Sequence, residues 1–136
     1  MKVLIGFDGS LSAWTALERA IALFAAAQPE IVLLGAFVRP MTSEVLAEEA
    51  FDAARDEARD ELKAAAGVVR DAGLSGRIRF IEGEPRKVLE NVTLEEEPDV
   101  VVVGARGKGA LTKVLLGSVS TYAVKHLPCS VLVVRS

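Results

Sequence analysis

Four consecutive valines, Val100 to Val103, constrain the fold of this chain more than any other stretch. A short apolar run of this kind predicts a strand that is buried on both faces. Pro98 and Asp99 precede the run and Gly104 follows it, so the expected strand is bounded at both ends. Strands buried on both faces belong to parallel sheets that helices cover on each side. The valine run therefore predicts an α/β fold.

The rest of the chain alternates between short apolar runs and longer stretches with helical periodicity. We expect strands at residues 2–7, 31–38, 78–81, 100–103 and 130–134, and helices at 13–27, 43–72, 85 to 92 or 94, and 119–125. This alternation demands a parallel sheet with right-handed crossovers. The expected architecture is an open five-stranded parallel sheet with helices on both faces, in a single domain over residues 1–136.

Two glycines that follow the valine run, and a glycine-serine pair farther on, form the pattern that indicates a binding site. Gly104 and Gly107 stand at the expected strand end, and Gly117-Ser118 follow Gly107 after nine residues. Glycines can adopt a positive φ and let the backbone approach a phosphate. The first N–H groups of the helix that begins there, with the Ser118 and Ser120 hydroxyls, favour an anion. The pattern predicts a phosphate site at the carboxyl ends of the strands, where open α/β sheets bind ligands.

Strand, Gly-x2-Gly, nine residues, Gly-Ser and helix together resemble the ATP-binding signature of the universal stress protein family. Residues 3–10 resemble that family's first strand and its aspartate-containing turn, and residues 128–134 resemble its last strand. The resemblance covers essentially the whole chain and weakens only between residues 40 and 75. It implies a Rossmann-like, adenine nucleotide alpha hydrolase-like fold with the strand order 3-2-1-4-5. In that order Asp8 would lie beside Gly104.

The resemblance also implies which residues would contact a nucleotide, and the implied cofactor is ATP. The family's adenine, ribose and phosphate positions fall on Gly6, Phe7, Asp8, Ala36, Gly104, Arg106, Gly107, Gly117, Ser118, Val119 and Ser120. Lys108 and Gly109, which lie in the same glycine loop, complete the candidate cofactor-binding residues.

Among these residues, Asp8 is the candidate with the most specific expected role in binding the nucleotide. Its carboxylate could accept from the adenine or ribose edge, or hold a divalent metal on the phosphates. The alternative is an aspartate that caps the next turn. Mg²⁺ or Mn²⁺ would suit phosphate and carboxylate oxygens, whereas one cysteine and one histidine far apart in the sequence give no zinc site.

Residues for fast phosphoryl transfer do not accompany the glycine loop. The motif Gly-x4-Gly-Lys-[Ser/Thr] is absent, no general base can be named, and His126 is expected to interact with carbonyls at a helix end. We therefore expect an ATP-binding sensor or regulatory module with slow or negligible turnover and assign no catalytic residue. Two alternatives stay open: a slow ATP hydrolase or phosphotransferase, and a non-nucleotide module whose charged helix at residues 44–63 recruits a protein partner.

Composition narrows the class of protein further. At 136 residues the chain can bury one core, and its net charge of −3 argues against a nucleic-acid partner. The single cysteine, Cys129, cannot form an internal disulfide, and no signal peptide precedes the first expected strand. The longest apolar run is far shorter than the roughly 20 residues of a membrane span. We expect a cytoplasmic protein with no membrane partner.

The last expected strand, Ser130 to Val134, favours self-association. If this apolar strand lies at the edge of the sheet, its free backbone groups can pair with another copy. Members of the resembled family commonly form such dimers. We therefore expect a twofold-symmetric homodimer that is joined along this strand.

Overall fold

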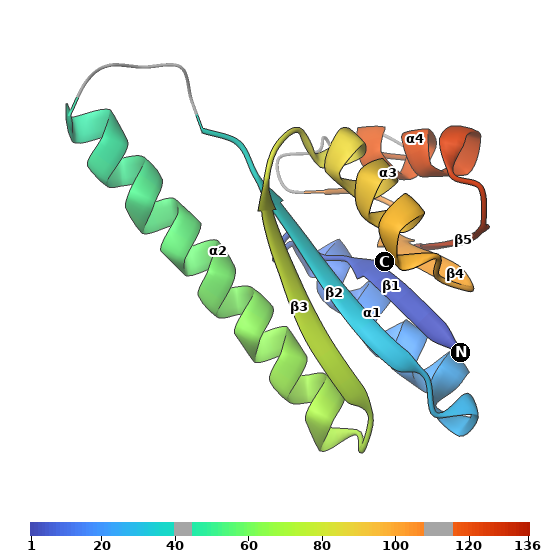
Figure 1. Ribbon diagram of the computed structural model, residues 1–136. Helices are drawn as coiled ribbons and strands as arrows, with labels where there is room; N and C mark the ends of the chain where they lie inside the picture. Colours follow the sequence, from blue (N-terminus) through green and yellow to red (C-terminus); the bar gives the residue numbers. More distant parts are fainter. Residues whose placement is uncertain (40–44, 108–115) are drawn as a thin grey trace.

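The computed structural model describes residues 1–39, 45–107 and 116–136. Five parallel strands form one sheet in the order β3-β2-β1-β4-β5 (Figure 1). The strands are β1 (Lys2–Gly6), β2 (Glu30–Phe37), β3 (Ser75–Glu82), β4 (Val100–Gly104) and β5 (Ser130–Val134). The helices are α1 (Leu11–Phe24), the short 3-10 turn η1 (Ala25–Ala27), α2 (Val45–Asp71), α3 (Pro85–Glu96) and α4 (Ser118–His126). The expected single-domain α/β fold and the strand order 3-2-1-4-5 are confirmed.

Alternate residues of each strand feed two separate cores. Val3 and Ile5 of β1 face a core that α1 and α2 cover, whereas Leu4 between them faces a second core beneath α3 and α4. The valine run divides in the same way, because Val102 joins the first core and Val101 the second. The inner strands and β5 are therefore apolar along most of their length, whereas the edge strand β3 alternates Arg77 and Arg79 with Ile78 and Phe80.

α1 begins where a serine caps it. Ser10 Oγ accepts a hydrogen bond from the backbone N–H of Ala13, at 3.1 Å, which makes Ser10 the N-cap of the helix. Trp14, one turn into the helix, packs edge-on against Phe7, with 5.0 Å between the ring centroids. This contact fixes the start of α1 over the end of β1.

α2 is longer than the strand beside which it packs. Its 27 residues span about 40 Å, whereas the eight residues of β3 span about 26 Å. Only its C-terminal half, with Leu62 and Val69, reaches the core, and the two elements diverge toward the start of the helix (Figure 1). Ala54, which stands eight residues before Leu62 and so at helical spacing from it, is therefore exposed.

An aromatic cluster joins the upper part of α2 to the sheet. Phe37 at the end of β2 stacks on Phe80 of β3 with 4.5 Å between centroids, and Phe51 of α2 lies 6.3 Å from Phe37. The Arg39 guanidinium lies over the Phe51 ring at 4.5 Å from its centroid. These contacts support a stretch of α2 that has little core beneath it.

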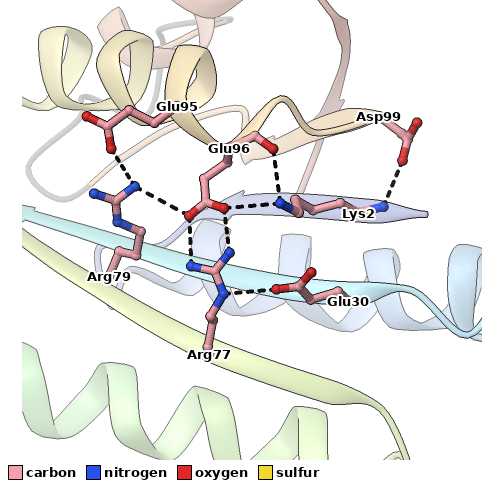
Figure 2. Close-up of polar contacts among 7 residues, drawn as sticks. All are labelled: Lys2, Glu30, Arg77, Arg79, Glu95, Glu96 and Asp99. Carbon is pink, nitrogen blue, oxygen red and sulfur yellow. Dashed lines mark hydrogen bonds and ion pairs between the residues drawn. The ribbon is translucent and has the colours of Figure 1, made fainter.

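An ion-pair network joins the amino ends of three strands to the end of α3 (Figure 2). Its members are Lys2, Glu30, Arg77, Arg79, Glu95, Glu96 and Asp99. Glu96 is the centre, with a carboxylate that is 8% exposed and accepts from both terminal nitrogens of Arg77 and from Lys2 Nζ at 3.2 Å. Arg77 Nε donates to Glu30 at 2.9 Å. The hydrogen bond from Arg77 holds the pKa of Glu96 at about 2, against the ordinary 4.5.

Glu96 is expected to make the free energy of unfolding depend on pH in the acidic range. A carboxyl whose pKa is lowered on folding stabilises the protein fully above pH 4.5, and the contribution disappears as the pH falls toward 2. Glu96→Gln should lower the free energy of unfolding at pH 7 by about 1 to 2 kcal/mol, because water around Arg77 weakens the pair. Urea unfolding from pH 7 to pH 3 measures the difference, which should shrink as the pH falls.

Glu95→Gln is the matched control for this experiment. Glu95 precedes Glu96 and pairs with Arg79 at 2.7 Å, but its side chain is 58% exposed. The change should therefore cost less than about 0.5 kcal/mol at any pH. An equal effect of the two substitutions, or a Glu96→Gln loss that stays constant with pH, would contradict the role given to Glu96.

Candidate nucleotide site

A pocket opens where β1 and β4 end side by side. Its volume is about 570 Å³, and it lies where successive connections leave the sheet in opposite directions, from β1 toward β2 and from β4 toward β5. It is lined by Gly6, Phe7, Asp8, Ala13, Leu34, Ala36, Pro85, Leu89, Val103, Gly104, Arg106, Gly107, Gly117, Ser118, Val119 and Ser120. Eleven of these residues are candidates that the sequence singles out. The remaining two candidates, Lys108 and Gly109, lie outside the described residues.

The sequence reasoning missed the apolar walls of the pocket. Leu34, Leu89 and Val103 belong to the core beneath α3 and α4, and each also lines the pocket. Pro85 contributes from the first turn of α3, and Ala13 from the first turn of α1. Helix and strand periodicity assigns such residues to the core, so no local signal separates a pocket wall from ordinary packing.

The N-terminus of α4 points its first N–H groups at this pocket. Its N-cap is Gly117, with φ −74° and ψ 174°, and no side chain caps the helix. The caps of two other helices are different, because Ser10 accepts from an amide of α1 and Glu84 accepts from Arg86 and Lys87 of α3. α4 therefore carries the positive end of its dipole without a side-chain acceptor.

The two serines of this turn differ in their availability. Ser118 is exposed and lines the pocket. Ser120 is 1% exposed, and its hydroxyl lies 3.1 Å from the carbonyl oxygens of both Ala105 and Gly117, to which it can donate. The expected anion contact from a hydroxyl therefore suits Ser118, whereas the Ser120 hydroxyl joins the loop after β4 to the start of α4.

The glycines of the loop are explained by space and not by a positive φ. Positive φ occurs at Gly9, Gly73 and Gly83 among the described glycines, so the expectation for Gly104 and Gly107 is wrong. A Cβ on Gly104 would lie 2.4 Å from Ser12 Oγ and 2.8 Å from the Ser12 carbonyl oxygen. A Cβ on Gly107 would lie 2.9 Å from the Asp8 carboxylate. Both glycines therefore allow the loop to pack against the turn after β1.

The loop is held by bonds to three separate elements. The backbone N–H of Arg106 donates to Ser12 Oγ at 3.3 Å, and the N–H of Ala105 donates to the carbonyl of Val134 at 2.8 Å. The N–H of Gly117 donates to the carbonyl of Ala105 at 2.6 Å, which fixes the start of α4 against the end of β4. These bonds fix the backbone of Ala105 and Arg106 against α1, β5 and the start of α4.

Comparison with known proteins bears directly on this arrangement. The model of the universal stress protein family matches residues 1–135. The chain belongs to the universal stress protein family. A curated member from Thermus aquaticus, the universal stress protein in the QAH/OAS sulfhydrylase 3' region, is 32% identical over 138 residues, which cover 98% of this chain and 97% of the relative.

Solved structures of similar shape include hypothetical protein MJ0577, with a TM-score of 0.90 and 26% identity over 99% of this chain and 95% of the other. Another is a universal stress protein that was crystallised in complex with cAMP, with a TM-score of 0.67 and 27% identity over 99% of this chain and 96% of that chain. In the described part of this universal stress protein, no helix combines the length and the apolar character that crossing a membrane requires.

Asp8 lines the pocket of this universal stress protein and also holds a turn. One carboxylate oxygen, Oδ1, accepts from the backbone N–H of Ser10 at 3.0 Å, so the capping interpretation of Asp8 is confirmed. No group of three metal-binding side chains forms within the described ranges. Asp8 would therefore supply one protein ligand to a divalent metal that is carried by phosphates, as Mg²⁺ commonly accepts.

The chemistry that the described lining residues can perform is binding. Asp8 is the one carboxylate among them, and Arg106 is the one cation. His126 lies outside this pocket, and its ring packs on Tyr122 at 4.2 Å between centroids. Cys129 is partly buried beside the second core, and burial raises the pKa of its thiol. The pocket offers backbone donors, one cation and apolar walls to a ligand.

Proposed function

We propose that this universal stress protein binds an adenine nucleotide, with ATP as the expected ligand, and acts as a nucleotide-dependent regulatory module in the stress response. The observation that carries the proposal is the start of α4, where the Gly117 N-cap leaves amides without a side-chain acceptor at the rim of a pocket of about 570 Å³. An anion is the natural partner of such a helix end, and a phosphate matches its geometry.

The apolar lining of the pocket suits a flat, largely apolar group. Leu34, Ala36, Leu89 and Val103 line it, and Gly6 contributes no side chain. An adenine ring can pack on such walls and pair its edge with backbone groups. Its ribose would lie between the base and the phosphates, near Asp8 and Gly104. The similar protein that was crystallised with cAMP supports an adenine nucleotide as the ligand class.

Binding rather than turnover is the expected activity. We still expect Lys108 and Gly109 to contact the phosphates. Mg²⁺ or Mn²⁺ would bind to the phosphates, with Asp8 as the protein ligand of the metal. Fast phosphoryl transfer also needs a positioned nucleophile and several metal ligands, for which the described lining residues give no candidates. We therefore expect ATP turnover well below about 1 per second.

Isothermal titration with ATP, AMP and cAMP, with and without Mg²⁺, tests the proposal. We expect saturable binding with one nucleotide per chain. Bound ATP should be released intact, with no detectable inorganic phosphate formed by hydrolysis. No binding of any of these nucleotides would contradict the proposed function. Turnover in the range of about 1 to 1,000 per second would replace the regulatory module with an enzyme.

The proposal includes a twofold-symmetric homodimer that works in the cytoplasm. β5 is an edge strand of the sheet, and Val131, Leu132 and Val133 remain partly exposed along it. Pairing with β5 of a second copy would cover these side chains and satisfy the edge backbone groups. Sedimentation that shows a monomer at micromolar concentration would contradict this part of the proposal.

A further inference from the structure

A second groove continues from the nucleotide pocket along α4. It has a volume of about 310 Å³, and it is lined by Arg86, Leu116, Gly117, Ser118, Thr121, Tyr122, Lys125 and His126. Gly117 and Ser118 line both cavities, so the groove begins where the proposed phosphate position ends. From Ser118 to Lys125 the helix rises about 10 Å. The groove is thus an extension of the pocket toward solvent.

Two cations line the groove from different helices. Arg86 lies in the first turn of α3 and Lys125 near the end of α4, and both are exposed. Thr121 and Tyr122 of α4 also line the groove. None of the described residues that line the groove is a carboxylate. Helix side chains tilt toward the N-terminus, so Lys125 leans back toward Ser118.

Nearby carboxylates are engaged in contacts of their own. Glu84 accepts from Arg86 Nε at 2.8 Å, and this bond uses none of the terminal nitrogens of that guanidinium. Glu90 accepts from the Tyr122 hydroxyl at 2.5 Å, while Lys87 Nζ lies 3.1 Å from the same hydroxyl. The terminal nitrogens of Arg86 make no bond that involves other described residues, so they can donate to an anion.

A basic residue near the end of a helix also stabilises the helix dipole, which accounts for Lys125 on its own. It does not account for Arg86, which stands at the start of α3 and faces the same groove. Arg86 near a positive helix end is unfavourable unless an anion is close. The Glu84 carboxylate offsets part of the repulsion between Arg86 and the positive end of α3, and a bound phosphate would offset the rest.

We propose that this groove is a second anion subsite, which binds the outer phosphates of a nucleoside polyphosphate whose first phosphate lies at the start of α4. The inference rests on the proposed function and deepens it. Arg86 and Lys125 then make the affinity for a nucleotide depend on its number of phosphates, whereas the main pocket recognises the base. Mononucleoside and dinucleoside polyphosphates share this chemistry.

Titration of AMP, ATP, adenosine tetraphosphate and diadenosine tetraphosphate into the wild type and the variant Arg86→Gln/Lys125→Met tests the subsite. We expect wild-type affinity to rise from AMP to ATP and again to the tetraphosphates. The double variant should lose about tenfold in affinity for ATP and more for the tetraphosphates, while its affinity for AMP stays within about twofold. Tighter binding of the dinucleoside than of adenosine tetraphosphate would support a dinucleoside as the natural source.

Arg19→Gln is the matched control, because it removes one exposed cation from α1 away from the groove. It should leave all four affinities unchanged, and equal melting temperatures verify that the groove variants are folded. An unchanged ATP affinity in the double variant, or an equal loss for AMP and ATP, would overturn the subsite alone. If the wild type binds neither AMP nor ATP, the proposed function is overturned and the subsite with it.

Discussion

Gly104→Ala is expected to lower the free energy of unfolding by about 3 kcal/mol, the largest effect of any single methyl group in this site. The added Cβ would meet the Ser12 side chain at 2.4 Å and the Ser12 carbonyl oxygen at 2.8 Å. A hydroxyl can rotate away, but the carbonyl belongs to the first turn of α1 and cannot. The helix start or the end of β4 must therefore move. Urea unfolding monitored by circular dichroism measures the change.

Two further variants make this experiment decisive. Gly67→Ala lies within α2, where a Cβ has its nearest neighbour at 3.7 Å, so it should stabilise the protein by about 0.5 to 1 kcal/mol. Adding Ser12→Ala to Gly104→Ala should restore only part of the lost stability, because the carbonyl contact remains and the Arg106 N–H loses Ser12 Oγ as its acceptor. A Gly104→Ala variant as stable as the wild type would contradict the close packing of the loop on α1.

Gly117→Asp is expected to weaken ATP binding by about 100-fold or more. The backbone of Gly117 has a negative φ of −74°, and a Cβ there would have its nearest neighbours at 3.4 Å, so a side chain fits. An aspartate at this N-cap would accept from the first amides of α4 and occupy the position of the phosphate. Its charge would also repel the ligand. Isothermal titration with ATP measures the loss.

Gly117→Asn separates charge from size. Asparagine has the same shape as aspartate and also caps helices well, but it carries no charge. We expect Gly117→Asn to retain ATP affinity within about tenfold of the wild type and both variants to melt no lower than the wild type. An equal loss in the two variants would assign the effect to size, whereas ATP binding by the aspartate variant as tight as that of the wild type would contradict a phosphate at the start of α4.

Periodicity predicts an element of this fold well where burial on both faces makes a strand continuously apolar. It predicts the edge strand β3 less well, because Arg77 and Arg79 alternate with apolar residues there and only residues 78–81 are expected as a strand. Val100–Gly104 and Ser130–Val134 stand within one residue of their expected bounds. The strand order came from the family resemblance, since periodicity says nothing of which strands are neighbours. Ala54 of α2 is exposed although it has helical spacing to the buried Leu62, because an apolar stripe does not reveal where the sheet beneath it ends.

The polar half of the candidate site could be predicted, but its apolar half and the reasons for its glycines could not. Gly104 is required by packing on Ser12, a residue whose nearness follows only from the folded structure. Leu34 and Val103 line the pocket and belong to the core at once. The contact between Arg77 and Glu96 joins residues 19 apart from different elements, so no local spacing indicates it.

Chemical shift changes in ¹⁵N-labelled protein during titration with ATP locate the nucleotide site, because each backbone amide reports its own surroundings. We expect saturable shifts concentrated at Gly107 and at Ser118 to Ser120, with smaller ones at Phe7 and Ala36. Shifts confined to other parts of the chain, or no shifts at saturating ATP, would contradict a nucleotide site in this pocket.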